Sequence, residues 1–216
     1  MQSNLKHICF DLDGTLVESH KTIYNSTIKS LNDLKIPNNI DEEIFRKNIG
    51  KHFVDIFDDM NIPVIDFEEF IKIYKNNYFL FIDDSELYPD VSNVLKYFSQ
   101  NGFKISLLTT KGQDQAEKII NHFNLSEYFD LIMGRRNGIA HKPSPEPLLL
   151  ICDELNVNTS ESLIVGDTEM DILCGQNANV STCVITHGYR TEESILQYKP
   201  DFIVKNLNEL RKLFVK

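Results

Sequence analysis

Two carboxylates stand close together at the end of a short apolar run near the start of the chain. The run Ile8-Cys9-Phe10 is followed by Asp11-Leu12-Asp13-Gly14-Thr15. Residues two apart on an extended backbone point to the same side, so Asp11 and Asp13 can face one site while Leu12 turns into the core. Close carboxylates repel each other and lose solvation, and such a pair usually persists because it serves a cation, a proton or a reaction.

Hydroxyl groups and a lysine follow later apolar runs. Thr109-Thr110-Lys111 comes after Ile105 to Leu108 and offers hydroxyl and backbone N–H groups that suit phosphate oxygens. His141-Lys142-Pro143 precedes a helix start and places an ammonium group near the edge of the predicted sheet. Taken alone, Lys142 is more simply interpreted as a surface lysine.

A second acidic pair follows the run Leu163-Ile164-Val165. The segment Gly166 to Asp171 carries Asp167 and Asp171, four residues apart, where a strand passes into a helix. Capping of the helix by Asp167 and binding of a metal ion are both compatible with this pattern.

Apolar runs alternate with helical spacings from Lys104 onward, which predicts a parallel sheet with helices on its faces. Ser144 and Pro145 are expected to start one helix, as its cap and its first residue, and a last helix is expected from about Asn206. The predicted strands contain Ile105–Leu108, Leu131–Met133, Leu163–Val165, Thr182–Ile185 and Phe202–Val204.

The stretch from Ser19 to Asp84 differs, because it shows helical periods and no convincing strand. Its apolar stripes are expected to pack a small helical bundle. Because it follows the loop after the first strand, it is expected to lie over the carboxyl ends of the strands as a lid or cap. We therefore predict an α/β protein with a Rossmann-like parallel sheet core formed by residues 1–17 and 86–216. An α-helical cap is predicted over residues 18–85.

The composition is that of a soluble globular protein, with 42% apolar and 25% charged residues in a chain of 216. Residues 1–6 lack the apolar stretch of a signal peptide, and no segment approaches the ~20 apolar residues of a membrane span. The four cysteines are widely spaced, which favours buried free thiols and, with the other signals, a cytoplasmic location. The net charge of −10 argues against an extended nucleic-acid surface but not against a small phosphorylated ligand.

The order of these motifs resembles the haloacid dehalogenase superfamily. The DxDGT segment at Asp11, the strand-end Thr109, the Lys142-Pro143 pair and the GDxxxD segment at Asp167 occur in matching contexts. Leu87 to Val91 and Thr186 to Tyr189 look like the phosphoglycolate phosphatases, whose subgroup carries a small α-helical cap.

The resemblance implies a phosphatase mechanism. Asp11 would be the nucleophile that forms an aspartyl phosphate, and Asp13 would be the general acid and base. Mg²⁺ would be held by Asp11, the backbone carbonyl of Asp13 and Asp167, with Asp171 beside the metal. The phosphoryl oxygens would be bound by Thr109, Thr110 and Lys142.

Two other functions have the same kind of site. A sugar phosphomutase would return the phosphoryl group to another hydroxyl, although Thr15 favours a phosphatase. A phospho-aspartate switch without turnover also places Asp, Thr and Lys at strand ends, but Asp13 and the insertion argue against it. The sequence leaves open whether the protein is a monomer or a homodimer.

The substrate is expected to be a small phosphorylated metabolite, such as phosphoglycolate, a nucleotide, pyrophosphate or a sugar phosphate. In relatives the cap lines the pocket of the leaving group, so Gly50, Lys51 and His52 are candidates for substrate contacts. For His52 alone, a surface histidine is the simpler interpretation.

Overall fold

The computed structural model describes residues 4–215, and a six-stranded parallel sheet lies at its centre. The strand order is β5-β4-β1-β6-β7-β8, which places β1 between β4 and β6. Because parallel strands end at the same edge of a sheet, the segments after β1, β4 and β6 meet there. The predicted α/β class is thus confirmed. The strands are β1 (His7–Phe10), β4 (Lys104–Gly112), β5 (Leu131–Arg135), β6 (Ser162–Gly166), β7 (Ser181–Ile185) and β8 (Phe202–Val204).

Helices pack on both faces of this sheet, so its strands are buried apolar runs. Along β1, Phe10 belongs to the larger apolar cluster with Phe98 and Leu210, whereas Cys9 packs on the opposite side with Ile151 and Cys174. The first face is covered by α5 (Val91–Gln100), α6 (Gln113–His122) and α10 (Leu207–Lys212), and the second by α7 (Glu146–Glu154) and α8 (Glu169–Asn177). The remaining elements of this part are α9 (Glu192–Leu196), η2 (Ser126–Tyr128) and η3 (Thr159–Glu161).

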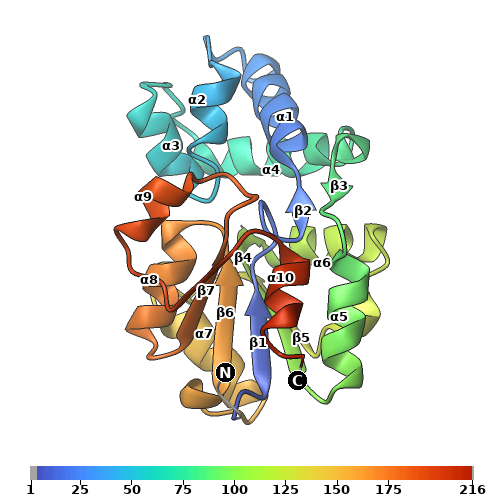
Figure 1. Cartoon of the computed structure of the whole chain (residues 1–216). Helices are drawn as coiled ribbons and strands as arrows, with labels where there is room; N and C mark the ends of the chain where they lie inside the picture. The colour runs from blue at the N-terminus through green and yellow to red at the C-terminus, as the bar shows by residue number, and fades with distance from the viewer. Residues whose placement is uncertain (1–3, 216) are drawn as a thin grey trace.

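Residues 20–84 form a helical segment at the end of the sheet toward which the strand arrows point (Figure 1). Phe57, Phe70 and Tyr78 are fully buried between its helices, as the apolar stripes predict. Within residues 4–215, no helix combines the length and the hydropathy needed to cross a membrane. The segment contains α1 (His20–Asp33), α2 (Glu42–Arg46), α3 (Phe53–Asp59), α4 (Phe67–Tyr78) and η1 (Ile82–Asp84).

A two-stranded ribbon joins the helical segment to the sheet. The strands β2 (Val17–Glu18) and β3 (Glu86–Leu87) pair antiparallel, with Val17 opposite Leu87. The chain therefore leaves the sheet after β1 and returns to it through two adjacent short strands.

Two elements differ from the sequence expectation. β4 does not end at Leu108 but continues to Gly112, which pairs with Arg135 after an irregularity in the register. The helix expected to begin at Pro145 begins at Glu146, because Pro145 occupies the capping position. The Ser144 hydroxyl still accepts a hydrogen bond of 3.3 Å from the backbone N–H of Glu146, so its capping contact is kept.

Candidate active site

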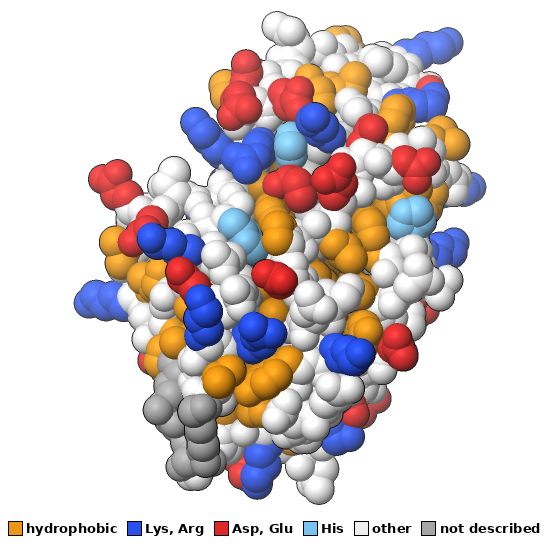
Figure 2. Space-filling model, turned by 45° about the vertical axis from the view of Figure 1, so that its right-hand side comes forward, with side chains coloured by type: hydrophobic (Ala, Val, Ile, Leu, Met, Phe, Trp, Pro, Cys, Tyr) orange, Lys and Arg blue, Asp and Glu red, His pale blue; other side chains and the backbone are white. Residues whose placement is uncertain are grey.

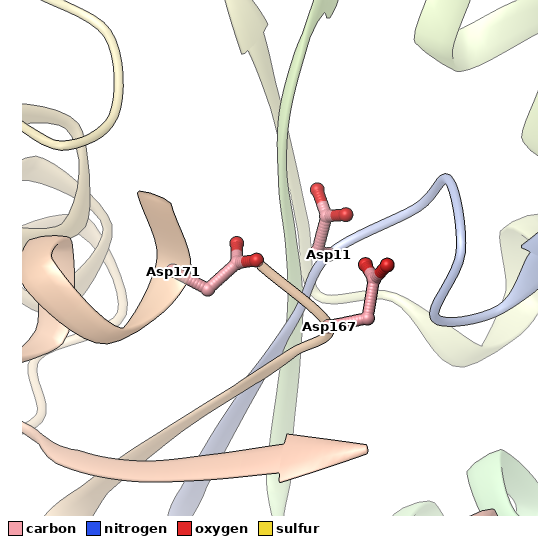
Figure 3. A group of neighbouring side chains, drawn as sticks. All are labelled: Asp11, Asp167 and Asp171. Carbon is pink, nitrogen blue, oxygen red and sulfur yellow. The ribbon is translucent and has the colours of Figure 1, made fainter. Parts of the chain in front are cut away.

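Three buried aspartates converge at the carboxyl edge of the sheet (Figure 3). Asp11 follows β1, Asp167 follows β6, and Asp171 lies in the first turn of α8. One carboxylate oxygen from each residue lies within 4.8 Å of the other two. The strand order brings these side chains together from distant parts of the chain.

Lys142 joins two members of this cluster. Its Nζ donates to Asp11 Oδ1 at 2.6 Å and to Asp171 Oδ1 at 2.5 Å, and it also donates to the Leu108 carbonyl at 3.0 Å. Burial lowers the pKa of the Lys142 ammonium, but the two carboxylates more than offset this effect and raise that pKa. Lys142 is therefore a charged, buried residue of the site and not a surface lysine.

One lysine does not neutralise the cluster. Burial raises the pKa of Asp11 to about 7 despite Lys142, and the neighbouring carboxylates of Asp171 and Asp13 add to the rise. Burial and the charges of Asp11 and Asp171 also raise the pKa of Asp167 well above its usual range. Crowded carboxylate oxygens with unbalanced negative charge are the donor set that a hard divalent cation prefers, so these residues fit Mg²⁺.

Asp167 is held in a narrow slot. A Cβ added at Gly14, whose φ is +81°, or at Gly188 would lie 2.3 Å from Asp167 Oδ2. The Thr15 hydroxyl donates to Asp167 Oδ1 at 3.2 Å, and the Tyr189 N–H donates to Oδ2 at 2.7 Å. The glycine and threonine that follow Asp13 therefore serve to position the Asp167 carboxylate, which follows a different strand.

Asp171, and not Asp167, caps the helix α8. Thr168 is the capping residue, and Asp171 Oδ2 accepts from its backbone N–H at 3.1 Å and from its hydroxyl at 2.8 Å. The alternative that Asp167 is only a helix cap is thus wrong, because Asp167 precedes the capping position and points into the cluster.

Asp13 is buried beside this cluster but has separate partners. Its Oδ2 lies 3.1 Å from Lys111 Nζ, and its Oδ1 accepts a hydrogen bond from the Ser19 hydroxyl. The Ser19 hydroxyl also contacts the Tyr189 hydroxyl at 3.1 Å. The two carboxylates of the DxD segment therefore lie in different electrostatic surroundings.

A pocket opens between the carboxyl edge of the sheet and the helical segment. Asp11, Asp13, Thr110 and Lys142 line it from the sheet side. Thr109 is buried behind this wall, and its hydroxyl accepts from the Lys111 N–H at 3.3 Å. The structure thus brings Thr110 to the pocket surface more directly than Thr109.

The three residues expected from the helical segment also line the pocket. Gly50 has φ +101° and lies against Thr168, and Lys51 Nζ pairs with Asp59 Oδ2 at 2.9 Å. His52 contacts the guanidinium of Arg135, and burial, together with that positive charge, lowers its pKa. The interpretation of His52 as a surface histidine is wrong, because its ring is half-buried in the pocket wall.

Several pocket residues were not singled out from the sequence. Arg135 is the last residue of β5. Lys111 directly follows Thr109 and Thr110, and its place beside these predicted phosphate-binding residues is a signal in the sequence. Lys75 and Gln115 depend on tertiary packing alone and carry no local signal. The pocket residues not singled out are thus Lys75, Lys111, Gln115 and Arg135.

The sequence matches the family of haloacid dehalogenase-like hydrolases over residues 8–185, and the chain belongs to that family. It is 35% identical to a Clostridium perfringens protein provisionally named pyrophosphatase PpaX, over 98% of each chain. It is 32% identical to a phosphoglycolate phosphatase of Aquifex aeolicus, over 97% of this chain and 96% of that one.

The fold is also found in a solved structure of a haloacid dehalogenase-like hydrolase from Streptococcus pneumoniae. That structure superposes with a TM-score of 0.88, at 24% identity, over 99% of this chain and 100% of that chain. The predicted class is therefore confirmed: the protein is an enzyme of the haloacid dehalogenase-like hydrolases, and its named relatives are phosphatases.

Proposed function

We propose that the protein is a Mg²⁺-dependent phosphatase that hydrolyses a small phosphorylated metabolite through an aspartyl phosphate on Asp11. The observation that carries the proposal is the separation of the two carboxylates of the DxD segment. Asp11 lies with Lys142 and the cluster of Asp167 and Asp171, whereas Asp13 lies apart with Ser19 and Lys111. One carboxylate is thus placed to attack phosphorus and the other to move a proton.

The two half-reactions use these residues in turn. A carboxylate oxygen of Asp11 forms a bond to phosphorus while the bond between phosphorus and the leaving oxygen breaks, and Asp13 gives that oxygen a proton. Asp13 then takes a proton from a water molecule, which attacks phosphorus and releases phosphate and the free Asp11 carboxylate. Lys142 would bind phosphoryl oxygens with Thr109 and Thr110 while it keeps Asp11 oriented.

The metal would be held by Asp11, Asp167 and the backbone carbonyl of Asp13, with Asp171 beside it. Bound Mg²⁺ would neutralise the crowded carboxylates and the charge that develops on the transferring phosphoryl group. Thr15 and the Tyr189 N–H keep Asp167 oriented for this role.

The substrate is proposed to be a small molecule with a negatively charged leaving group. The pocket that contains Asp11 and Asp13 is also lined by Lys75, Lys111 and Arg135. The relatives named above take their names from pyrophosphate and phosphoglycolate, and both of these compounds leave an anion behind. On the face drawn in Figure 2, basic and acidic side chains are interspersed, which favours a small ligand over an extended nucleic acid.

Phosphate release from an aryl phosphate tests this function. We expect release that requires Mg²⁺, is abolished by a chelator and returns when Mg²⁺ is restored. Asp11→Asn should lower turnover at least about 1,000-fold because it removes the nucleophile. Asp58→Asn is the matched control, since Asp58 is exposed on the helical segment.

Release without Mg²⁺, or release that survives Asp11→Asn, would refute the mechanism. Incubation with a hexose 1-phosphate separates hydrolysis from a mutase reaction: free phosphate is expected, and the hexose 6-phosphate would indicate the mutase.

A further inference from the structure

A second buried lysine lies next to the site. Lys111 is only 9% exposed, and its Nζ lies 3.1 Å from Asp13 Oδ2 and 4.6 Å from the ring centroid of Tyr78 in α4. Lys142 already contacts Asp11 and Asp171, so Lys111 is not needed for those two charges. Removing an ammonium from water is costly, and one carboxylate and one ring offset that cost only in part. The placement of Lys111 therefore calls for a function.

The position of Asp13 locates that function. If Asp13 gives its proton to the leaving oxygen, that oxygen must lie at the Asp13 carboxylate. Lys111 contacts the same carboxylate and lines the same pocket. An atom bonded to the leaving oxygen, or one bond further on, is then within reach of the Lys111 ammonium on its flexible stem.

Gln115 supplies an independent sign of a ligand. It stands four residues after Lys111 in the first turn of α6, lines the same pocket and is only 3% exposed. Its Nε2 has no hydrogen-bond partner among the residues that the structure describes. A buried amide N–H without a partner is unfavourable unless a bound molecule accepts its hydrogen bond.

We propose that Lys111 and Gln115 form a subsite for the charge of the leaving group. Its ligand is a carboxylate or phosphate group carried one or two bonds from the leaving oxygen, as in phosphoglycolate and pyrophosphate. An ammonium and an amide N–H together suit the two oxygens of such an anion. This inference rests on the proposed function. It assigns the choice of substrate to residues of β4 and α6 and not to the helical segment.

The alternative is an ion pair that only orients Asp13. Such a pair would affect phosphoglycolate and an uncharged alkyl phosphate equally, because both have alkoxide leaving groups that need the same proton donor. A subsite for the leaving group would affect only substrates that carry the additional charge. The comparison of charged and uncharged leaving groups therefore separates the two roles.

The experiment compares phosphoglycolate with 2-hydroxyethyl phosphate, its uncharged analogue, and with an aryl phosphate. Lys111→Met should lower kcat/KM for phosphoglycolate about 100-fold more than for the other two substrates, because all three lose the contact of Lys111 with Asp13 but only phosphoglycolate also loses a charge partner. Lys111→Arg should restore at least about a tenth of the phosphoglycolate activity. Gln115→Leu should lower kcat/KM for phosphoglycolate by about tenfold. Lys118→Met, at an exposed lysine of α6, is the control and should match the native protein.

Binding to the Asp11→Asn protein gives a readout that does not depend on turnover. Adding Lys111→Met should raise the Kd of phosphoglycolate about 30-fold and leave the Kd of inorganic phosphate unchanged, which also shows that the variant is folded. The same fold loss for phosphoglycolate and 2-hydroxyethyl phosphate, or no loss for either, would overturn the subsite. A native protein that cleaves the aryl phosphate but neither phosphoglycolate nor pyrophosphate would also overturn it. If the native protein cleaves nothing, the proposed function fails, and the binding measurement still decides the subsite.

Discussion

Asp11 and Asp13 are two residues apart in the chain but have different partners. Asp11 contacts Lys142 and lies in the aspartate cluster, whereas Asp13 contacts Lys111 and Ser19. Identical side chains can perform different chemistry when their neighbours differ. The proposed roles of nucleophile and proton donor therefore depend on Lys142 and Lys111, which come from distant parts of the chain.

A titratable group away from the site makes stability depend on pH. His7 is fully buried at the start of β1, and its ring nitrogens contact the hydroxyls of Ser162 at 2.9 Å and Ser106 at 2.8 Å. Burial lowers its pKa from 6.5 to about 4, although Asp130 partly opposes this shift. In the unfolded chain His7 takes up a proton near pH 6.5, but in the folded protein it stays neutral to about pH 4.

We therefore expect stability from His7 that is complete above pH 6.5 and is lost as the pH falls toward 4. Between pH 7.5 and 5.0 the free energy of unfolding should fall by about 2 kcal/mol more in the native protein than in His7→Asn. Urea unfolding at the two pH values measures this difference. The same pH slope for both proteins would contradict the role of His7.

The residue types of the site could be predicted better than their contacts. Asp11, Asp167 and Lys142 stand in motifs whose local pattern carries the signal. The pairing of Lys111 with Asp13, and the contact of His52 with Arg135, join segments that only the folded chain brings together. No local pattern could indicate those pairs.

At the scale of elements, the apolar runs predicted the strands because a parallel sheet covered on both faces needs continuous burial. The last helix begins after its cap Asn206, as expected. The extension of β4 through Thr109-Thr110-Lys111 to Gly112 could not be predicted, because polar residues that line or adjoin the pocket give no strand signal. The extension also depends on the pairing of Gly112 with Arg135 in β5. Likewise, the capping role of Asp171 became clear only from the turn that joins β6 to α8.

The turn after β1 gives a prediction at this scale. Gly14 has φ +81°, and a Cβ there would lie 2.3 Å from Asp167 Oδ2. Gly14→Ala should lower kcat/KM at least about 100-fold, because it strains the turn and displaces the carboxylate. Gly102 is a matched control, since it has φ +80° and no atom within 4 Å of an added Cβ.

Gly102→Ala should cost about 1 kcal/mol of stability and leave kcat/KM unchanged. Steady-state kinetics and urea unfolding of both variants measure these effects. Full activity in Gly14→Ala would show that the turn does not hold Asp167 in place.

At the scale of the whole molecule, the pocket requires both the sheet and the helical segment. The segment is attached through the β2–β3 ribbon and is held against the sheet by polar contacts. Lys75 in α4 pairs with Asp114 in α6 at 2.6 Å. We propose that residues 18–85 act as a cap domain that closes over the substrate by movement about this ribbon.

Arg190 links the two parts near the pocket. It forms two hydrogen bonds with Glu169, at 2.7 and 3.0 Å, and donates to the carbonyl of Ile49, which precedes Gly50, at 3.0 Å. Arg190→Met should raise KM about tenfold and change kcat by less than about threefold. The reason is that residues 49–53, which line the pocket, would then occupy their substrate-binding position less often.

Kinetics and amide hydrogen exchange over residues 49–53 check this expectation, and faster exchange should accompany the higher KM. Lys104→Met serves as the control, because it removes the pair of Lys104 with Asp130, at 2.7 Å, where β4 and β5 begin and so at the opposite ends of the strands from the pocket. An unchanged KM in Arg190→Met would show that this link does not position the loop.

The most direct test of the account is to identify the phosphorylated residue. Protein quenched in acid during turnover should carry an acyl phosphate, which borohydride reduces so that Asp11 is recovered as homoserine in peptide mapping. We expect this product at position 11 in the native protein and none in Asp11→Asn. Turnover without any reduced residue, or homoserine at Asp13 or Asp167 instead, would contradict it.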